Sequence, residues 1–288
     1  MSQLATFKIP EYSVESKLGG GLTVVNQEQL TCLRRGVAFW NKWREDYPEV
    51  QPDMMNANLK GMYLKGINLR ETNLTDTDLK GAYCLKGSCQ NVEGDQAHFD
   101  GSYLKEADFT GAYLQGSSFK GADLRNVNFT NAHLVGVDFR GADIQGADFS
   151  GANLYRSQLM GVIASETKWC KANLLSANLL GTDLRSANLE NANLTRANLE
   201  EVNLSNALAF HTNFEQATLT GVCIDQLKIN NQTNFRRAVC DFVYLKADRQ
   251  GRYPFPSNYQ SLEEDAIALI SRISSKLIPM RSSSSSPV

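Results

Sequence analysis

An apolar residue recurs at every fifth position over most of the chain, from Met54 to Ile229. This register holds 36 repeats, and 29 of the apolar anchors are Leu, Phe or Ile. The residue two before the anchor is Ala, Ser, Thr or Val in 31 repeats, and the residue directly before it is Asn or Asp in 20. Residues two apart in an extended segment point to the same side, so the small residue and the anchor face inward. The pattern predicts short extended segments joined by turns.

A five-residue unit cannot bury its apolar face alone, so its copies must stack into a solenoid. Glycine stands two residues after the anchor every twenty residues, from Gly61 to Gly221, and only Glu201 interrupts it. Four repeats therefore make one coil, and 36 repeats make nine coils. At about 4.8 Å for each stacked layer, the shaft is roughly 43 Å long. The Phe anchors between Phe99 and Phe149 alternate with aliphatic ones, which places Phe on two opposite walls.

The repeated unit A-(N/D)-L-x-x resembles the pentapeptide-repeat family, and the resemblance covers about 180 residues. This resemblance implies an all-β solenoid, a right-handed quadrilateral β-helix, here of about nine coils with short helical caps at both ends. Members of the family are often cyanobacterial. The handedness and the cross-section follow from the resemblance, whereas the coil length follows from the glycines.

Three segments depart from the repeat. The anchors Cys84, Cys89 and Gly94 are small, so we expect a distorted coil or a small cavity there. Ala164 is followed by the large anchor Trp169, and the two volumes compensate. Beyond Ile229 the register slips by one residue, and the shaft is expected to end near there.

Each open end of a solenoid exposes unpaired strand edges and therefore needs a cap. Asn26 and Gln29 predict the start of an N-terminal helix, whose stripe of Leu30, Leu33, Val37 and Trp40 would cover the shaft. Ser261 and Glu264 predict a second amphipathic helix, which either packs locally as a cap or associates with a second copy as a homodimer, as relatives in the family do. The predicted organisation is an N-terminal segment with the capping helix (1–51), the β-helix (52–235), a C-terminal extension with the amphipathic helix (236–280) and a disordered tail (281–288).

Net charge, apolar runs and the number of cysteines and histidines argue against several classes of protein. With 29 basic and 31 acidic side chains, the formal charge of −2 argues against a strongly basic nucleic-acid binder. Neither a signal peptide nor an apolar run of membrane-spanning length occurs, so we expect a cytoplasmic protein without a transmembrane segment. The six cysteines form no C-x-x-C pair, and three histidines are poor material for a zinc site.

Catalysis needs groups that converge in a concave site, and a convex shaft offers none. His98, His133 and His211 fall on different walls or turns, so they are expected to be surface residues. Asp123 and Asp143 stack one coil apart and are expected to form a solvated ladder rather than a cation site. We therefore expect a non-enzyme without cofactors or metal ions.

Two groups of outward residues are candidates for partner binding, because clustered exposed apolar side chains are typical of interfaces. One is a column of tyrosines twenty residues apart, Tyr63, Tyr83 and Tyr103, although stacked tyrosines also serve packing. The other lies further along the shaft and consists of Val135, Tyr155, Met160, Leu175 and Leu180.

The leading hypothesis is a non-enzymatic interaction protein, a rigid rod that presents its walls to an unidentified protein partner in a scaffolding or regulatory role. The alternative is a DNA-mimic type of binder, because the resemblance includes quinolone-resistance proteins that protect DNA gyrase with an acidic rod. The predicted shaft carries a net charge of only −5. A DNA duplex of about 43 Å would carry roughly 25 negative charges, so the charge disfavours the mimic.

Overall fold

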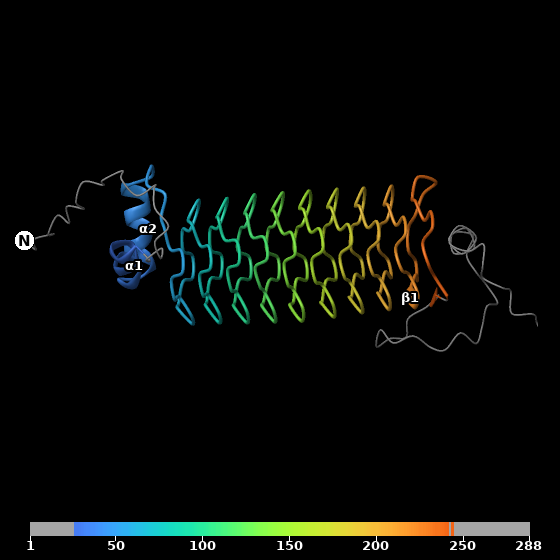
Figure 1. The fold of residues 1–288 in the computed structure, drawn as a ribbon, viewed down its shortest axis with the longest axis horizontal. Coiled ribbons are helices and arrows are strands. Elements are labelled where there is room, and N and C mark those ends of the chain that lie inside the picture. The colour runs from blue at the N-terminus through green and yellow to red at the C-terminus, as the bar shows by residue number, and fades with distance from the viewer. Residues whose placement is uncertain (1–25, 242, 245–288) are drawn as a thin grey trace, which may run out of the picture.

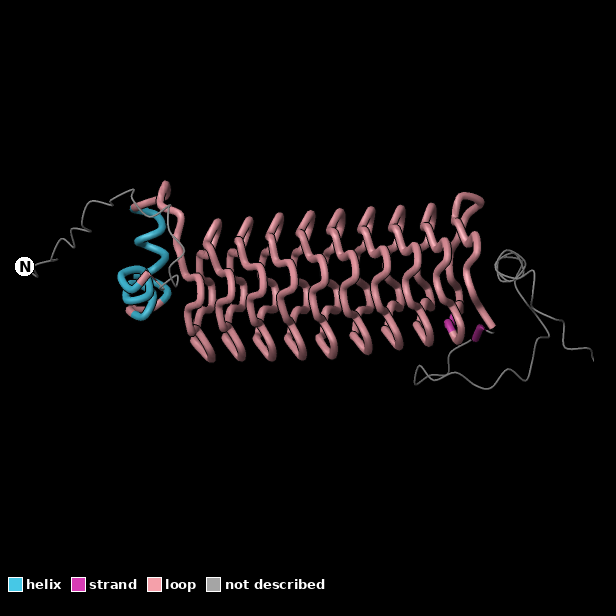
Figure 2. The backbone as a smooth tube through the Cα atoms, in the orientation of Figure 1, coloured by secondary structure: helices cyan, strands magenta, loops and turns pink. Residues whose placement is uncertain are grey.

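The structure is a computed structural model that describes residues 26–241 and 243–244. Two short helices, α1 (Gln27–Arg34) and α2 (Val37–Asp46), lie at the N-terminal end of a long shaft of stacked coils (Figure 1). The chain forms a right-handed quadrilateral β-helix. Almost all of the shaft is drawn as loop in Figure 2, because each extended segment makes single bridges to the coils beside it. Two short strands pair at the C-terminal end, β1 (Val222–Cys223) and β2 (Val243–Tyr244).

The predicted coil length is confirmed by the strand pairing. Parallel bridges join each outward residue to the residue twenty positions later, from Asp53 with Asn73 to Leu208 with Lys228. Backbone hydrogen bonds join neighbouring coils in the same register, as from the amide of Met54 to the carbonyl of Asn73 (2.8 Å). A tight turn closes after most anchors, as from the amide of Ala57 to the carbonyl of Met54 (2.9 Å). Four turns in each coil produce the four walls of the shaft.

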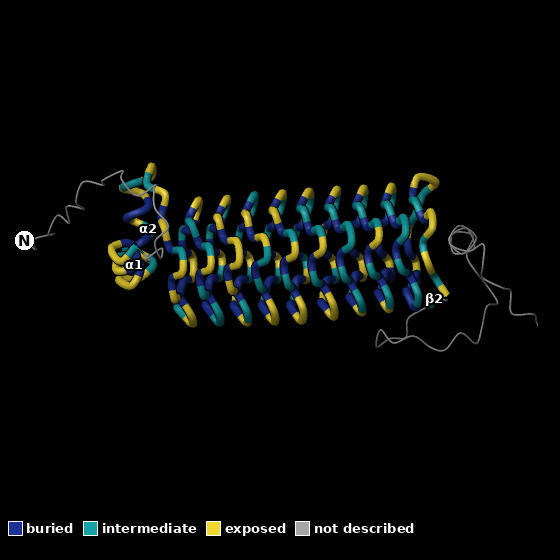
Figure 3. The backbone as a smooth tube through the Cα atoms, viewed as in Figure 1, coloured by how far each residue is buried: buried dark blue, intermediate teal, exposed yellow. Residues whose placement is uncertain are grey.

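The anchors and the small residues fill the interior of the shaft, which Figure 3 shows as buried segments inside exposed corners. The phenylalanines stack along two walls, with ring centroids 4.6 Å apart between Phe99 and Phe119 and 5.2 Å apart between Phe109 and Phe129. Rings from the two walls meet edge to face across the core, as Phe99 and Phe109 do at 5.8 Å. Both arrangements are favourable geometries for aromatic pairs.

The structure explains the frequent Asn or Asp before the anchor. The side chain at each of these 20 positions accepts a hydrogen bond from the amide two residues later, at 3.0–3.3 Å. That amide belongs to the first corner residue, which donates no backbone hydrogen bond to a neighbouring coil. Asn and Asp are the residues that form such local turns. The polar residue of the repeat therefore satisfies the corner as well as facing the solvent.

The coil with small anchors is regular, so the expected distortion is wrong. Cys84 and Cys89 are buried, and the bridges through this region keep the spacing of twenty residues. A Cβ atom on Gly94 would lie 2.9 Å from Cδ2 of Leu114, which shows that the neighbouring leucine already occupies the space. Trp169 is buried as expected, stacks on Phe149 at 4.4 Å and donates its Nε1 hydrogen to Thr167 (2.6 Å).

The N-terminal cap consists of two helices where the sequence pattern predicted one. Asn26 accepts a hydrogen bond from the amide of Gln29 (3.1 Å), as expected. The helix then breaks at Gly36, whose φ of 109° and ψ of 162° are accessible essentially to glycine alone. The break turns α2 toward the shaft, where Trp40 donates from Nε1 to the carbonyl of Asn68 (2.7 Å). Arg44 donates to the carbonyls of Val50 and Arg70, so the cap is fixed to the first coil by hydrogen bonds and packing.

Pairing between coils continues beyond residue 235, where the sequence pattern predicts the end of the β-helix. After Ile229 the spacing becomes 21 residues, as in the bridge from Asn213 to Asn234, which accommodates the slip in register. Phe235 is buried and stacks on Phe214 at 5.0 Å, and the pairing of β1 with β2 extends the coil to Tyr244. The predicted C-terminal helix and tail lie outside the described residues. Neither described helix has the length and apolarity to cross a bilayer.

Candidate functional site

The shaft has four walls, each with one outward residue per coil. We number the walls by the first outward residue, so that wall 1 begins at Asp53, wall 2 at Asn58, wall 3 at Tyr63 and wall 4 at Asn68. Two corner residues separate each wall from the next, and they are exposed or half-buried except for Ser205 and Gly221. Any binding site on the shaft is therefore a combination of wall columns and corner columns.

The first three outward residues of wall 3 are Tyr63, Tyr83 and Tyr103, which we call the tyrosine ladder. Their side chains are 70%, 41% and 42% exposed, respectively. The rings of Tyr83 and Tyr103 stack at 4.5 Å with an angle of 8° between their planes, whereas Tyr63 and Tyr83 are 6.2 Å apart and tilted by 35°. The column predicted from the sequence thus forms one continuous aromatic surface.

These tyrosines do not provide the corner hydrogen bond that Asn and Asp provide elsewhere in the repeat. A tyrosine before the anchor cannot accept a hydrogen bond from the corner amide as Asn or Asp does. In the described part of the chain, the amides of Lys65, Leu85 and Lys105 have no hydrogen-bond acceptor. Positions at which a repeat abandons its own local rule are expected to be functional or strained. Wall 1 also breaks this rule in three consecutive coils, with Glu93, Tyr113 and His133, but only the ladder places a tyrosine in all three.

One corner beside wall 3 carries a side chain at only the first of its two positions in most coils. The corner between walls 2 and 3, which we call the glycine corner, has glycine as its second residue in eight of nine coils, and the other three corners have glycine in two of nine each. Backbone conformation does not require glycine at this corner, since Lys86, Glu106 and Glu201 adopt the same positive φ at equivalent positions. Packing does not require it either, because a Cβ on Gly61 or Gly81 would meet no atom within 4 Å. Beside the tyrosine ladder, the glycine corner therefore presents one side chain per coil, from Lys60, Lys80 and Asp100.

The second predicted group, which we call the mid-shaft patch, is divided by the structure. Val135, Tyr155 and Leu175 lie on consecutive coils at the corner between walls 1 and 2, and all three are half-buried. The guanidinium of Arg156 lies over the Tyr155 ring, 4.9 Å from its centroid. Met160 (36% exposed) and the half-buried Leu180 lie at the glycine corner on the opposite edge of wall 2. The prediction that the mid-shaft patch binds a partner stays a prediction.

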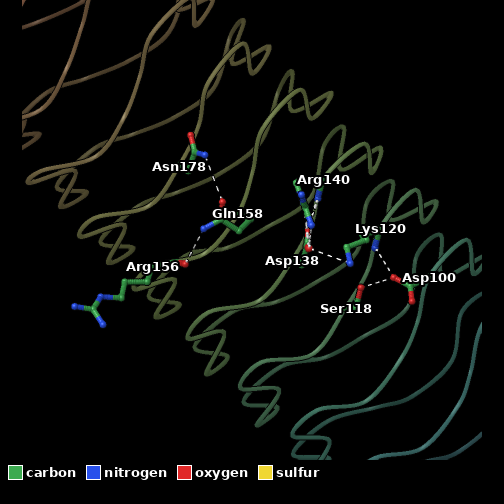
Figure 4. A network of polar contacts seen from close by, with 8 residues as sticks. All are labelled: Asp100, Ser118, Lys120, Asp138, Arg140, Arg156, Gln158 and Asn178. Carbon is green, nitrogen blue, oxygen red and sulfur yellow. Dashed lines mark hydrogen bonds and ion pairs between the residues drawn. The ribbon is translucent and has the colours of Figure 1, made fainter.

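The centre of wall 2, between the two halves of the mid-shaft patch, is polar (Figure 4). Asn178 donates to Gln158 (3.3 Å), and Gln158 donates to the carbonyl of Arg156 (3.5 Å). On the preceding coils Asp138 pairs with Arg140 (2.6 Å) and Lys120 (3.2 Å). A partner that covered the whole mid-shaft patch would have to accommodate this polar column.

Sequence reasoning missed two exposed residues. Ile163 is an outward residue of wall 3, is 51% exposed and lies three residues after Met160. The sequence does mark Ile163 as unusual, because it is an aliphatic residue at a position where the repeat favours Asn or Asp. Tyr113 is exposed on wall 1 and stacks on His133 at 4.5 Å. Five of the seven large apolar side chains that are exposed in the described part of the chain lie on wall 3 or its glycine corner: Tyr63, Tyr83, Tyr103, Met160 and Ile163.

A hollow of about 490 Å³ lies where the cap meets the shaft. Its residues come from separate coils and the cap linker, so no local sequence pattern marks it: Pro48, Glu49, Gln51, Glu71, Asn91, Glu93 and Tyr113.

The titratable groups of the shaft are of two kinds, carboxylates paired with cations on the surface and cysteine thiols buried in the core. The side chain of Arg125, which donates to Asp123 (2.6 Å), holds the pKa of Asp123 below its ordinary value and also approaches Asp143 (3.7 Å). The expected Asp ladder is thus covered by the protein's own cation. Burial raises the pKa of Cys84 to about 12 and raises that of Cys89 strongly. The described residues contain no group of three His, Cys, Asp or Glu side chains suited to a metal ion.

Comparisons with solved structures identify the same architecture. HetL, a pentapeptide repeat protein involved in heterocyst differentiation regulation from the cyanobacterium Nostoc sp. strain PCC 7120, aligns with a TM-score of 0.57 and 20% identity over 74% of this chain and 98% of that chain. QnrB1, a plasmid-mediated fluoroquinolone resistance protein, aligns with a TM-score of 0.44 and 18% identity over 63% of this chain and 92% of that chain. Rfr23 from the cyanobacterium Cyanothece 51142 aligns with a TM-score of 0.13 and 19% identity over 70% of this chain and 97% of that chain. Of these three, HetL supports the fold, and no curated protein matches the sequence significantly.

The five-residue repeats of the shaft match a known repeat family. The pentapeptide-repeat family matches in eight copies, over residues 53–83, 95–131, 122–159, 152–191 and 187–226. This is a repeat family and not an enzyme family. Because the matches span more than half of the sequence and coincide with the coils of the shaft, the chain belongs to the pentapeptide-repeat family.

Proposed function

We propose that the protein is a non-enzymatic binding protein, a rigid rod whose wall 3 docks onto a protein partner in a scaffolding or regulatory role. The tyrosine ladder carries the proposal, because it is a continuous exposed aromatic surface that the repeat does not need for folding. Tyrosine is enriched at protein interfaces, where its ring supplies contact area at a low cost in conformational entropy. The involvement of HetL in regulation is consistent with this role.

The glycine corner and the distal residues of wall 3 add to this surface. Met160 and Ile163 extend the apolar character beyond Asp123 and Asp143, which separate them from the tyrosine ladder. The wall therefore offers an aromatic segment, a charged segment and an aliphatic segment along one face. Such a mixture of apolar contacts and polar groups is typical of interfaces that form and dissociate.

The DNA-mimic alternative has less support. The most exposed wall carries tyrosines and lysines at its N-terminal end, whereas a mimic needs a dense column of carboxylates. On wall 2, Asp138 pairs with Arg140 and Lys120, and on wall 3, Asp123 pairs with Arg125, so these carboxylates are neutralised by neighbouring cations.

The test is affinity capture by the full-length chain from an extract of the organism that produces it, with quantitative mass spectrometry. In the double variant Tyr63→Asn/Tyr83→Asn, asparagine is the residue that the repeat prefers at these positions and provides the missing acceptor for the corner amides. We expect the variant to remain folded and to lose its specific partners at least tenfold, as for a hot spot worth about 1.4 kcal/mol or more.

Tyr113→Asn is the matched control, because it makes the same substitution at the same repeat position on wall 1. We expect it to retain the partners. The variant Tyr155→Ala/Leu175→Glu tests the mid-shaft patch in the same assay. Loss of the partners in this variant, with full retention in Tyr63→Asn/Tyr83→Asn, would move the interface to walls 1 and 2.

A further inference from the structure

The tyrosine ladder is surrounded by lysines at its N-terminal end. Lys60 and Lys80 lie at the glycine corner, and Lys65 lies at the opposite corner of wall 3. Lys60 and Lys65 are exposed, and they flank Tyr63, the most exposed tyrosine of the ladder. Among the described residues, none of the three lysines takes part in an ion pair.

The lysines further along this face are already paired. Lys86 lies 3.2 Å and Lys105 lies 3.8 Å from the carboxylate of Glu106, and Lys120 lies 3.2 Å from that of Asp138. The uncompensated positive charge is therefore concentrated in the first two coils, around Tyr63 and Tyr83. The hydroxyl groups of the tyrosine ladder likewise have no hydrogen-bond partner among the described residues.

We propose that the first coils of wall 3 bind an extended acidic segment of a partner protein, with its carboxylates on Lys60, Lys65 and Lys80 and its backbone along the tyrosine ladder. This inference rests on the proposed function and names the chemistry of the partner. Tyr63 and Tyr103 are two coils apart, or about 10 Å, which an extended chain covers with about three residues. Electrostatic complementarity of this kind selects the partner and speeds association more than it adds affinity.

The ring geometry favours a peptide over a single-stranded nucleic acid, although both are anionic. Proteins that bind single strands stack bases on free aromatic faces. In the ladder, Tyr83 and Tyr103 already stack on each other at 4.5 Å and 8°, so the faces between them are not available to bases. The exposed ring edges and hydroxyl groups suit contacts with carboxylates and extended backbone.

Fluorescence anisotropy with the full-length chain tests the proposal. The probe is a fluorescein-labelled peptide of about seven residues, with alternating glutamate and aspartate around a central phenylalanine, long enough to span the ladder. We expect saturable binding that weakens as NaCl rises, and no binding of the peptide in which amides replace all carboxylates. The variant Lys60→Gln/Lys65→Gln should weaken binding about tenfold, whereas the matched control Lys171→Gln/Lys228→Gln, with the same change in charge at exposed lysines elsewhere on the shaft, should leave it within about twofold.

Three outcomes would overturn the proposal. The first is absence of binding, or equal loss in the two lysine variants. The second is tighter, competing binding of an oligothymidylate, which would assign the lysines to nucleic acid. The third is self-association of the chain that Lys60→Gln/Lys65→Gln abolishes, which would make a second copy the occupant. If the peptide fails but Tyr63→Asn/Tyr83→Asn still loses captured proteins, the proposed function stands and only the acidic partner is wrong.

Discussion

At the scale of single residues, each position of the five-residue repeat has a distinct physical role. The anchor and the small residue fill the core, and the Asn or Asp between them accepts the corner amide, as Asn128 does from Thr130 (3.0 Å). Where the chain departs from these choices, the departure is informative. Tyr63, Tyr83 and Tyr103 give up this hydrogen bond and gain exposed aromatic surface, which is why we assign them to binding.

The anchors dominate stability. Leu134 is fully buried in the regular middle of the shaft, so Leu134→Ala should lower the free energy of unfolding by about 2–5 kcal/mol through lost burial and the cavity that remains. Cys89→Ala removes only one heavy atom from a buried site and should lower it by about 1 kcal/mol. Urea unfolding followed by circular dichroism measures both values. Equal losses for the two variants would show that the anchors do not contribute according to their volume.

The pairing of Asp123 with Arg125 makes stability depend on pH. Because the pKa of Asp123 is lowered in the folded state, its contribution is present above the ordinary Asp pKa of about 3.9 and is lost as pH falls through the lower folded value. Asp123→Asn keeps the acceptor for the corner amide of Arg125 but cannot ionise. Its melting temperature should therefore fall less than that of the wild type between about pH 5 and pH 2. Parallel curves for the two proteins would rule out this contribution.

The residue scale also shows how far the sequence predicts the structure. Leu134 and the other anchors could be identified as core because their period is unmistakable. The acceptor role of the outward Asn and Asp was missed, since it depends on which corner amide lacks a partner in the coil. Ile163 was missed because it lies in a segment where the anchors Ala164 and Trp169 also depart from the repeat, so that a single outward aliphatic residue does not stand out. The half-burial of Tyr155 and Leu175 could not be predicted, because it depends on neighbouring corner side chains such as Arg156.

At the scale of elements, the cap shows how a single backbone position divides a helix. The apolar stripe through Leu33, Val37 and Trp40 predicts a single helix. It identifies the buried residues Leu33 and Trp40 correctly, but the structure has two helices. Gly36 interrupts it, and Trp40 and Arg44 then reach the carbonyls of Asn68 and Arg70 on the first coil. A helix propensity scale treats glycine as a modest penalty, whereas here its φ of 109° directs the next element.

This role predicts the effect of Gly36→Ala. A Cβ at this position would meet no atom within 4 Å, so any loss comes from the backbone conformation and not from a clash. We expect a decrease of about 1–3 kcal/mol in the free energy of unfolding, because residues with a side chain rarely adopt this conformation. Gly61→Ala is the control, since its φ of 64° is one that non-glycine residues adopt at equivalent corners. Thermal unfolding compares the two, and an equal effect would contradict the assigned role of Gly36.

At the scale of the whole molecule, the fold could be predicted almost completely and the binding surface only in part. The twenty-residue glycine spacing defined the coil, and the bridges from Asp53 to Lys228 confirm it. The same glycines also reduce one corner to a single side chain per coil, and the equivalent corners show that neither backbone conformation nor packing requires them. The rod is thus asymmetric around its axis, with wall 3 as its most exposed apolar face.

Site-specific photo-crosslinking tests most directly whether wall 3 is the binding surface. A photoreactive benzoylphenylalanine replaces Tyr83 on wall 3 in one protein, Tyr155 of the mid-shaft patch in a second and Tyr113 on wall 1 in a third, so that each replacement exchanges one aromatic ring for another. After irradiation with the captured partner, we expect a crosslinked product from position 83 and none from positions 113 and 155. A crosslink from position 155 without one from position 83 would contradict the assignment of the interface to wall 3.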